Sequence, residues 1–266
     1  MPADPVAPVQ PLAFPAADEV DLERRFGGLR RLYGDAAYLR IRSASVAVVG
    51  LGGVGSWTVE ALARSGVARL VLFDLDHVAE SNINRQVQAT SRTLGQHKGA
   101  ALRERIAGIH PGCDVVVVDA FVEPERWPAL LPAPVHALVD ACDQVRAKAA
   151  LAAWSLQSCV PLVCVGAAGG KRAPQRVEVE DLADATHDPL LASLRQRLRK
   201  EAGAPRRGRI GVRCVFSRES VAAPADSCAT DGTLNCHGYG SSVTVTATFG
   251  MAAAAEVLAQ LTGEPR

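Results

Sequence analysis

The sequence predicts an α/β fold in which a doubly wound, mostly parallel sheet is extended by antiparallel strands. A glycine-rich turn, GLGGVGS, follows a short apolar run and opens an amphipathic segment. Apolar runs then alternate with helical segments up to about residue 170, after which alternating patterns take over. The chain has 266 residues, 48% of them apolar, which is enough for one sizeable domain with its own core.

The first half consists of strand and helix units. Residues 21–42 carry apolar side chains at helical spacing, and Gly27, Gly28 and Gly34 are expected to divide them into two short helices. A strand, a helix and a strand then form a βαβ unit with a right-handed crossover, at 45–50, 56–66 and 69–74. Beyond it we expect a helix at 97–109, a strand at 113–120, a helix at 124–132, a strand at 136–142, a helix at 144–159 and a strand at 161–170.

The second half has a different rhythm. An exposed antiparallel strand is expected at 175–182, then a helix at 188–203, a strand at 212–220 and a long polar loop at 223–241. The C-terminal stretch SVTVTATFGMAAAAEVLAQL is long and apolar. Its β-branched alternation, its alanine-rich end and the internal Glu256 favour a buried strand followed by a packed helix over a membrane span.

The termini and the cysteines indicate a soluble cytoplasmic protein. Residues 1–20 carry prolines and acidic residues where a signal peptide needs a basic end and an apolar run, so we expect a disordered leader before a single domain at 21–266. Seven cysteines without a C-x-x-C pair exclude the usual four-ligand zinc pattern and indicate free thiols. A net charge of +1 excludes a strong overall attraction to nucleic acid or membranes.

The glycine-rich turn is the first candidate ligand site. Gly50, Gly52, Gly53 and Gly55 lack the side chains that would keep a phosphate away from backbone N–H groups and from the start of the next helix. Such turns occur in nicotinamide, flavin and adenylate enzymes alike. Asp74 ends the following strand, where a carboxylate can accept hydrogen bonds from ribose hydroxyls; the simpler alternative is that it caps a turn.

The loop after this strand, in FDLDHVAESNINRQ, carries side chains that hydride transfer does not require. Arg85 has a planar fork that suits phosphate oxygens, and Lys98 adds a compact charge on the same side of the cleft. Together they could neutralise a triphosphate and stabilise the charge that develops on it. Asn82 and Gln86 can fix geometry without adding charge.

Two carboxylates follow the strand expected at 136–142. Asp140 and Asp143 would lie at the carboxyl edge of a parallel sheet, where α/β folds bind ligands. A carboxylate near three phosphates is a suitable magnesium ligand. For any one of these charges a solvated surface is the simpler explanation, but the whole set at these spacings predicts an ATP site.

GLGGVGS, FDLDHVAESNINRQ, GQHKGAAL and VDACDQ together resemble the superfamily of adenylating enzymes that includes ubiquitin-activating enzymes, ThiF and MoeB. The resemblance implies a Rossmann-like adenylation fold, with ATP and Mg²⁺ as cofactors and a homodimer as the assembly. It assigns the binding of ATP and its magnesium to Asp74, Asn82, Arg85, Gln86, Lys98 and Asp143, and we add Asp76 to this set. The family usually has asparagine where this chain has Gln144, so only Asp143 is carried over as the metal ligand.

A second resemblance spans roughly residues 24–258. RFGGLRRLYGDAAYLRIRSASVAVVGLGGVGSW, VEVEDLADATHDPLLASLRQRLR and SSVTVTATFGMAAAA are similar to the tRNA threonylcarbamoyladenosine dehydratase branch (TcdA/CsdL). It implies a tRNA substrate carrying threonylcarbamoyladenosine beside the anticodon, whose carboxylate is adenylated and then cyclises with net loss of water. It also implies a cysteine desulfurase and its sulfur acceptor as partners. A monovalent cation is a further candidate cofactor, and Arg42 or an arginine in 24–31 is expected to enter a second chain's ATP site.

Catalytic roles are expected for Arg85, Lys98, Asp143 and Cys236. Cys236 stands beside His237 in a polar loop, where an imidazolium would favour a thiolate that receives an acyl group; the alternative is an unreactive loop thiol. The remaining thiols are weaker candidates. Cys228 lies in the same loop, whereas inert core positions are expected for Cys142, Cys159 and Cys164.

Arginines between residues 195 and 209 form a local basic stripe in a chain of nearly neutral charge. A solvated helix face is the ordinary explanation of such a stripe. If the substrate is tRNA, the stripe is a place where phosphates would bind, so that neutralising several of its members should flatten the salt dependence of tRNA binding. The hypothesis concerns Arg197, Arg199, Arg206, Arg207 and Arg209.

Three alternatives to a tRNA-modifying dehydratase use parts of the same pattern. An activator of a sulfur-carrier or ubiquitin-like protein would use the same ATP site, but it commonly has a zinc tetrad, which the absent C-x-x-C pairs disfavour. A nicotinamide-binding oxidoreductase or redox sensor would leave Arg85, Lys98 and Asp143 without a purpose. A non-catalytic scaffold for a sulfur-relay partner would not need the complete ATP set.

Overall fold

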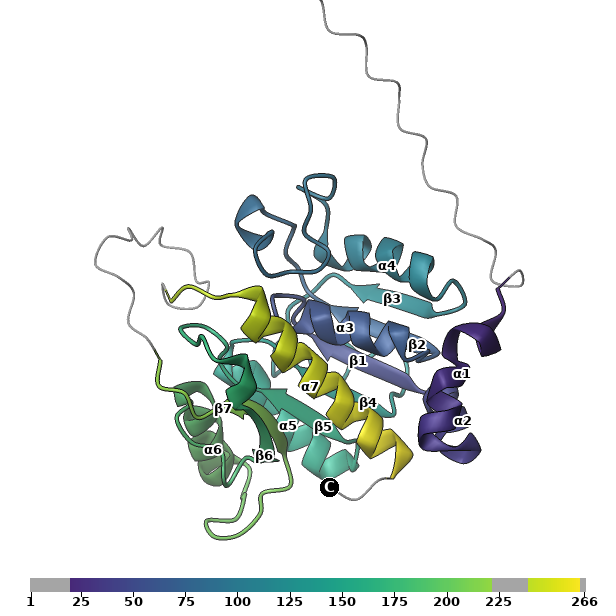
Figure 1. Cartoon of the computed structure of the whole chain (residues 1–266). Helices are drawn as coiled ribbons and strands as arrows, with labels where there is room; N and C mark the ends of the chain where they lie inside the picture. Colours follow the sequence, from purple (N-terminus) through teal and green to yellow (C-terminus); the bar gives the residue numbers. More distant parts are fainter. Residues whose placement is uncertain (1–19, 222–238, 264–266) are drawn as a thin grey trace, which may run out of the picture.

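The computed structural model describes residues 20–221 and 239–263, which form a seven-stranded sheet in the order β3-β2-β1-β4-β5-β7-β6 (Figure 1). In chain order the strands are β1 (Ser45–Val49), β2 (Arg69–Phe73), β3 (Asp114–Val118), β4 (Ala137–Asp140), β5 (Leu162–Val165), β6 (Val177–Asp181) and β7 (Arg213–Ser217). All neighbours pair in parallel except β6, which runs antiparallel to β7. The predicted fold class is therefore confirmed, with the antiparallel extension limited to one edge strand among those described.

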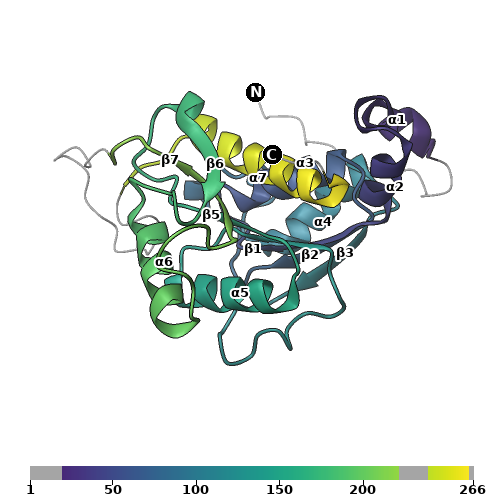
Figure 2. The same cartoon turned by 90° about the horizontal axis from the view of Figure 1, so that it is seen from below.

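The helices cover both faces of this sheet. One core cluster contains side chains of α2, α3, α4 and α7, and the other contains side chains of α5 and α6. Figure 2 shows α7 and α3 on one side of the strands and α5 on the other. The described helices are α1 (Leu22–Tyr33), α2 (Asp35–Ser43), α3 (Gly55–Arg64), α4 (Lys98–Ile109), α5 (Val145–Ser158), α6 (Pro189–Glu201) and α7 (Val243–Thr262), with 3-10 turns η2 (Glu80–Asn82) and η3 (Pro174–Arg176).

β1 is an interior strand next to the central β4, and all five of its residues are buried. Val46 and Val48 belong to the cluster with α3 and α7, whereas Ala47 and Val49 belong to the cluster with α5. β1 pairs with β2 on one side and with β4 on the other. The strand order therefore reverses between β1 and β4, and the crevice outside the carboxyl ends of such strands is where open α/β sheets bind ligands.

The C-terminal stretch is a single helix, α7, so the prediction of a strand at its start is wrong. Val245 is buried, and Thr248 Oγ1 donates to the Thr244 carbonyl at 2.7 Å, a bond that satisfies a threonine within a helix. A Cβ on Gly250 would lie 2.6 Å from the Val54 carbonyl oxygen, so this glycine lets α7 pass close to α3. By length and composition α7 could cross a membrane, but 56% of its apolar window is buried inside the fold.

The helix predicted at 124–132 is also wrong, because this segment forms turns. Pro128 and Pro132 lack a backbone N–H and restrict the conformation of the residues before them. Trp127 is buried and holds the segment to the sheet, with its ring 5.9 Å from that of Phe73. The segment is therefore irregular and is held to the sheet by one aromatic anchor.

The first two helices are separated at Gly34, which has a positive φ of 79°. α1 continues through Gly27 and Gly28, contrary to the expectation that these glycines interrupt it. Tertiary packing explains the continuity, because Phe26 and Gly27 are both buried. The number of helices was predicted correctly and one of the three expected breaks is real.

His110 anchors this helical pair to the end of α4. It is 2% exposed and contacts the Phe26 ring at a centroid distance of 4.9 Å. Arg42 Nη1 lies 3.0 Å from His110 Nε2, and because a guanidinium can only donate, Nε2 accepts and the imidazole is neutral. Burial, with the positive charges of Arg42 and Arg25, lowers the pKa of His110 to about 4.

The unfolding free energy should therefore fall on mild acidification. The unfolded chain protonates His110 near its ordinary pKa of 6.5, whereas the folded chain resists until about pH 4, so stability is complete above pH 6.5 and is lost between these values. The loss amounts to about 3 kcal/mol at most. Urea unfolding at pH 7 and pH 4.5 measures it, with His110→Gln as the control. An equally steep loss in that variant would contradict the assignment.

Candidate active site

The glycine turn links the carboxyl end of β1 to the start of α3. Gly50 has a φ of 86°, and a Cβ there would lie 2.9 Å from the Ala141 carbonyl. A Cβ on Gly55 would lie 1.8 Å from the Gly50 carbonyl oxygen. These two glycines are therefore required by the turn itself. A Cβ on Gly52 would meet nothing within 4 Å, so this part of the turn is open to a ligand, and α3 begins there without a side-chain cap.

Asp74 fastens this turn to the end of β2. It is 6% exposed; its Oδ2 accepts from the Leu51 N–H at 2.6 Å, and its Oδ1 accepts from the Asp76 N–H at 2.8 Å. The turn-capping alternative is thus part of its role. A carboxylate has about four acceptor positions, so two remain for the hydroxyls of a ribose.

The amide side chains of the following loop are held by internal hydrogen bonds. Asn82 is buried and its Oδ1 accepts from the Ala79 N–H at 3.1 Å. Gln86 Oε1 accepts from Gln88 Nε2, which also donates to the Leu51 carbonyl at 3.0 Å. Gln88 thus connects Gln86 to the glycine turn, whereas the Asn82 bond stays within the loop. The role expected for both amides at a nucleotide stays a prediction. Gln88 was missed, although a second glutamine between apolar residues could have suggested it.

Arg85 lies over the glycine turn. Its Cγ and Cδ are 3.3 Å from the position that a Cβ on Gly53 would occupy. Nη1 donates to the Ser81 carbonyl at 2.7 Å and to Asn84 Oδ1 at 2.9 Å, and the Arg85 carbonyl accepts from Trp57 Nε1 at 3.0 Å. Within the described residues, no carboxylate lies at ion-pair distance from this guanidinium. Its positive charge is therefore hydrogen-bonded to neutral groups but is not neutralised by an ion pair within these residues.

Lys98 begins α4 at the same edge of the sheet. Its side chain is only 7% exposed, and Nζ lies 2.7 Å from Asp76 Oδ2. The Lys98 N–H also donates to the Asp76 carbonyl at 3.0 Å. Asp76, one of the expected nucleotide-binding residues, therefore neutralises Lys98 in the protein alone. An incoming phosphate would compete with this carboxylate for the ammonium group.

The two carboxylates after β4 have different environments. Asp140 is fully buried and forms an ion pair with Lys148, with Oδ2 and Nζ 3.1 Å apart. Burial opposes the charge on Lys148, but the Asp140 carboxylate outweighs it and raises the pKa of Lys148 above its ordinary value. Asp143 is exposed before α5. Asp140 is thus occupied by a structural pair, and Asp143 is the carboxylate available to a metal.

These groups lie at one edge of the sheet. Comparison with known proteins shows the family to which the chain belongs. The ThiF family model matches residues 25–266. The chain belongs to the ThiF family. The tRNA threonylcarbamoyladenosine dehydratase of Haemophilus influenzae is 40% identical over 90% of this chain and 94% of its own length, and that of Escherichia coli is 41% identical over 90% and 93%. A crystal structure of the E. coli enzyme in complex with ATP superposes with a TM-score of 0.83, at 40% identity, over 91% of this chain and 95% of that one.

The thiols of this ThiF-family chain fall into distinct environments. Cys142 donates to Asp140 Oδ1 at 3.0 Å, and burial and the Asp140 charge raise the pKa of the Cys142 thiol. Cys164 is buried beneath the same carboxylate. The burial of Cys164 and the raised pKa of Cys142 favour the unreactive roles expected for them. Cys159 is exposed at the end of α5, where its φ is 58°, so the core position expected for it is wrong. Cys228 and Cys236 lie outside the described residues, so the expectation for Cys236 stays a prediction.

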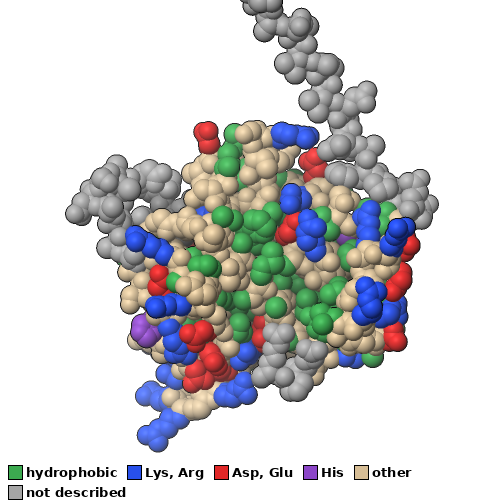
Figure 3. All heavy atoms as spheres, viewed as in Figure 1, with side chains coloured by type: hydrophobic (Ala, Val, Ile, Leu, Met, Phe, Trp, Pro, Cys, Tyr) green, Lys and Arg blue, Asp and Glu red, His purple; other side chains and the backbone are tan. Residues whose placement is uncertain are grey.

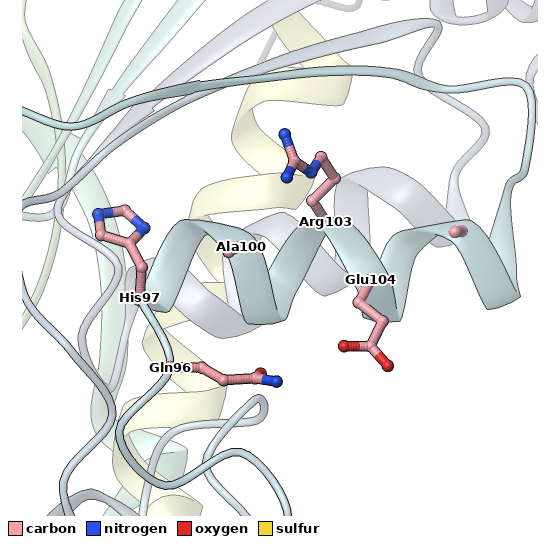
Figure 4. A pocket seen from close by; sticks show the side chains of 6 residues that line it. Gln96, His97, Ala100, Arg103 and Glu104 are labelled. Carbon is pink, nitrogen blue, oxygen red and sulfur yellow. The ribbon is translucent and has the colours of Figure 1, made fainter. Parts of the chain in front are cut away.

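Two hollows in the described part of this ThiF-family chain lie away from the glycine turn. The larger, about 460 Å³, runs along the outer face of α4 and reaches the site only at His97. Figure 4 shows Arg103 and Glu104 projecting from this face and His97 at the helix start. The smaller, about 260 Å³, lies between α5 and α6. We therefore define the candidate site by the polar groups at the carboxyl ends of β1, β2 and β4, and not by either of these hollows.

The arginines hypothesised to dock RNA lie at the other edge of the ThiF-family sheet. Their loop leads into the amino end of β7, which is parallel to β5, so it lies opposite the glycine turn. Arg197 is paired with Glu201 at 2.7 Å, and Arg199 donates to the Pro205 carbonyl. Exposed positions are held by Arg206, Arg207 and Arg209. Within one chain, these residues and the glycine turn therefore lie at opposite edges of the sheet.

Arg42, expected to reach a second chain, is engaged within its own chain. Besides contacting His110, its guanidinium lies over the Phe26 ring at 4.7 Å and donates to the Gly66 carbonyl. Arg24 and Arg31, on α1, are exposed. Among the candidates for this role, Arg24 and Arg31 are therefore more accessible than Arg42.

Proposed function

We propose that this chain is an ATP-dependent tRNA threonylcarbamoyladenosine dehydratase. The observation that carries the proposal is Arg85, whose side chain passes Gly53 of the glycine turn and whose guanidinium has no carboxylate partner among the described residues. The similarity to dehydratases over nine tenths of the chain supports the same substrate: tRNA bearing threonylcarbamoyladenosine. An activator of a sulfur-carrier or ubiquitin-like protein is the alternative that the site alone would also allow.

The chemistry proceeds in two steps. An oxygen of the threonyl carboxylate attacks the α-phosphorus of ATP, and pyrophosphate leaves to give an acyl-adenylate. A nitrogen of the same modification then attacks the activated carbonyl carbon, loses its proton and expels AMP, which closes the ring. The second step is intramolecular, so the nucleophile is present at high effective concentration and no protein nucleophile is required. Relative to the starting tRNA, the product lacks one water.

Each residue of the site has a proposed role that follows from its position. Asp74 holds the ribose, while the N–H groups at the start of α3 bind phosphate. Arg85 and Lys98 stabilise the negative charge that develops on the phosphates, and Asp76 returns to Lys98 after release. Asn82 and Gln86 keep the loop rigid. In this scheme the chain's donor set provides one free carboxylate for Mg²⁺, which would supply further charge neutralisation.

Asp143 is that carboxylate, and replacing it should alter the metal requirement. In Asp143→Asn the Mg²⁺ concentration for half-maximal AMP formation is expected to rise by at least about tenfold, because one anionic ligand is lost. Titrating Mg²⁺ at saturating ATP measures the shift. Glu104→Gln, on the outer face of α4, serves as the charge-matched control. An unchanged Mg²⁺ dependence in Asp143→Asn would remove the metal role.

The decisive experiment combines purified protein, Mg²⁺-ATP and total tRNA that carries threonylcarbamoyladenosine. Gentle digestion to nucleosides and mass spectrometry should reveal a product lighter by one water, with AMP formed in step. ATP–pyrophosphate exchange that requires a small carrier protein and never tRNA would favour the alternative activator. Retention of NAD instead of ATP would favour an oxidoreductase.

Cys236 is tested in the same assay. If its thiolate receives the acyl group from AMP before the ring closes, Cys236→Ser should form the adenylate, seen as ATP–pyrophosphate exchange, and yield no cyclic product. Full product formation in this variant would show that the nitrogen attacks the adenylate directly. His237 is the neighbouring group that could favour the thiolate.

The location, the assembly and the further partners of this chain are proposed from its substrate and its surface. A tRNA substrate supports a cytoplasmic location. Hydrophobic side chains run across the middle of the face formed by α3 and α7 (Figure 3), where Met251 is 43% exposed, and Leu32 and Leu39 on the first two helices are 71% and 60% exposed. Such exposure supports a homodimer, and light scattering measures it. A cysteine desulfurase with its sulfur acceptor and a monovalent cation are further candidates for binding studies.

A further inference from the structure

His97 lies between the two ends of the candidate ATP site, and the proposed function gives it no role. It directly precedes Lys98 and caps the start of α4, where its Nδ1 accepts from the Gly99 N–H at 3.1 Å. Its Nε2 lies 3.0 Å from the Asp74 carbonyl oxygen, at the end of β2. One imidazole therefore connects the residue expected at the ribose to the residue expected at the phosphates.

The hydrogen bonds fix which ring nitrogen carries the proton. Nδ1 accepts from a backbone N–H, so it has no proton of its own. Nε2 must then be the donor, to the Asp74 carbonyl and to Asp119 Oδ1 at 3.2 Å. The ring thus joins three elements at the carboxyl edge of the sheet: the end of β2, the start of α4 and the residue after β3. Its side chain is 15% exposed, so these three elements enclose most of the ring.

Capping alone does not explain this arrangement. A cap requires only one acceptor, which asparagine, aspartate, serine and threonine supply with a shorter side chain. The longer imidazole adds a donor that reaches the preceding strand. The imidazole is also closely packed. A Cβ on Gly99 would lie 3.2 Å from His97 Cε1, and the His77 ring lies edge-on to the His97 ring with 5.6 Å between the ring centroids. The second nitrogen is therefore held on its carbonyl acceptor.

We propose that His97 is a positioning residue for adenylation, which sets the separation between Asp74 and Lys98 and so aligns the ribose with the triphosphate. Misplacing reacting groups by about 1 Å can cost 100-fold in rate. The proposal rests on the proposed ATP chemistry, but it does not depend on which carboxylate is adenylated.

Two amide variants separate positioning from capping. His97→Asn keeps an acceptor near the place of Nδ1 and loses the donor to Asp74. His97→Gln keeps a donor near the place of Nε2 and loses the cap. Positioning predicts that His97→Asn keeps the wild-type melting temperature but lowers the rate of AMP formation at saturating ATP at least tenfold. It predicts that His97→Gln melts about 2–4 °C lower and keeps a rate within threefold of wild type.

A purely structural role predicts the opposite order, with activity following stability, and that result would overturn the proposal. A wild-type rate in His97→Asn would overturn it as well. His136→Asn is the matched control: His136 Nδ1 also accepts from a backbone N–H, that of Ser45 at 3.0 Å, but at the amino edge of the sheet. If wild-type protein forms AMP only with a carrier protein, the proposed substrate fails, and the same comparison with that carrier still tests His97.

Discussion

Replacing Arg85 by alanine is expected to lower the rate of AMP formation by about 100- to 1000-fold, the usual cost of removing one preorganised donor from a developing negative charge. The side chain lies over Gly53 with its guanidinium unpaired by any carboxylate of the described residues, so it contributes charge to the site without first breaking an ion pair. AMP release from Mg²⁺-ATP and modified tRNA, followed by chromatography, measures the rate.

Two further variants test whether the effect comes from the charge, the shape or the position of the Arg85 side chain. Arg85→Lys keeps the charge but loses the planar fork that binds two phosphate oxygens, so its rate should lie between wild type and Arg85→Ala. Arg103→Ala, on the outer face of α4, removes an exposed arginine outside the site and should leave the rate unchanged. If Arg85→Ala retained more than about a tenth of the wild-type rate, Arg85 would not stabilise the transition state.

Replacing Lys148 by methionine is expected to destabilise the protein by about 3–5 kcal/mol, because it leaves the Asp140 carboxylate as an uncompensated buried charge. Both side chains have no exposed surface, and Lys148 Nζ also donates to the Val165 carbonyl at 2.7 Å. The pair therefore joins α5 to the ends of β4 and β5. Urea unfolding at pH 7 measures the loss.

The double variant Asp140→Asn with Lys148→Met distinguishes an ion pair from simple packing. Removing both charges should restore a large part of the lost stability, since no buried charge is then left alone. Asparagine also keeps an oxygen that can accept from the Cys142 N–H, as Asp140 Oδ1 does at 3.2 Å. Additive losses in the double variant would show that the two residues act independently.

Local patterns in the sequence predicted the parts of the site that local geometry determines. The glycine turn, Asp74 and the loop to Gln86 each follow directly from a strand end, so their residue types and order indicate where they lie. The strand expected at the start of α7 failed because β-branched residues such as Val245 are buried against α3 and the sheet, and this packing outweighs their strand propensity.

Pairings between different elements could not be predicted. Lys148 gains its partner only when β4 and α5 are in place, and nothing in its helix pattern distinguishes it from a solvated lysine. The contact of His97 with the Asp74 carbonyl likewise depends on how the start of α4 meets the end of β2. The capping role of His97 could have been predicted, because the residue before a helix often supplies the cap.

The central place of α7 has a consequence for synthesis on the ribosome. β4, β5 and α3 are translated before it, but the helix that covers them is the last described element and passes against α3 at Gly250. At about 5–20 residues per second, the apolar face of the nascent sheet waits on the order of ten seconds for this cover. Chaperones have that interval in which to bind, and a stop codon placed before Val243 should yield aggregated polypeptide.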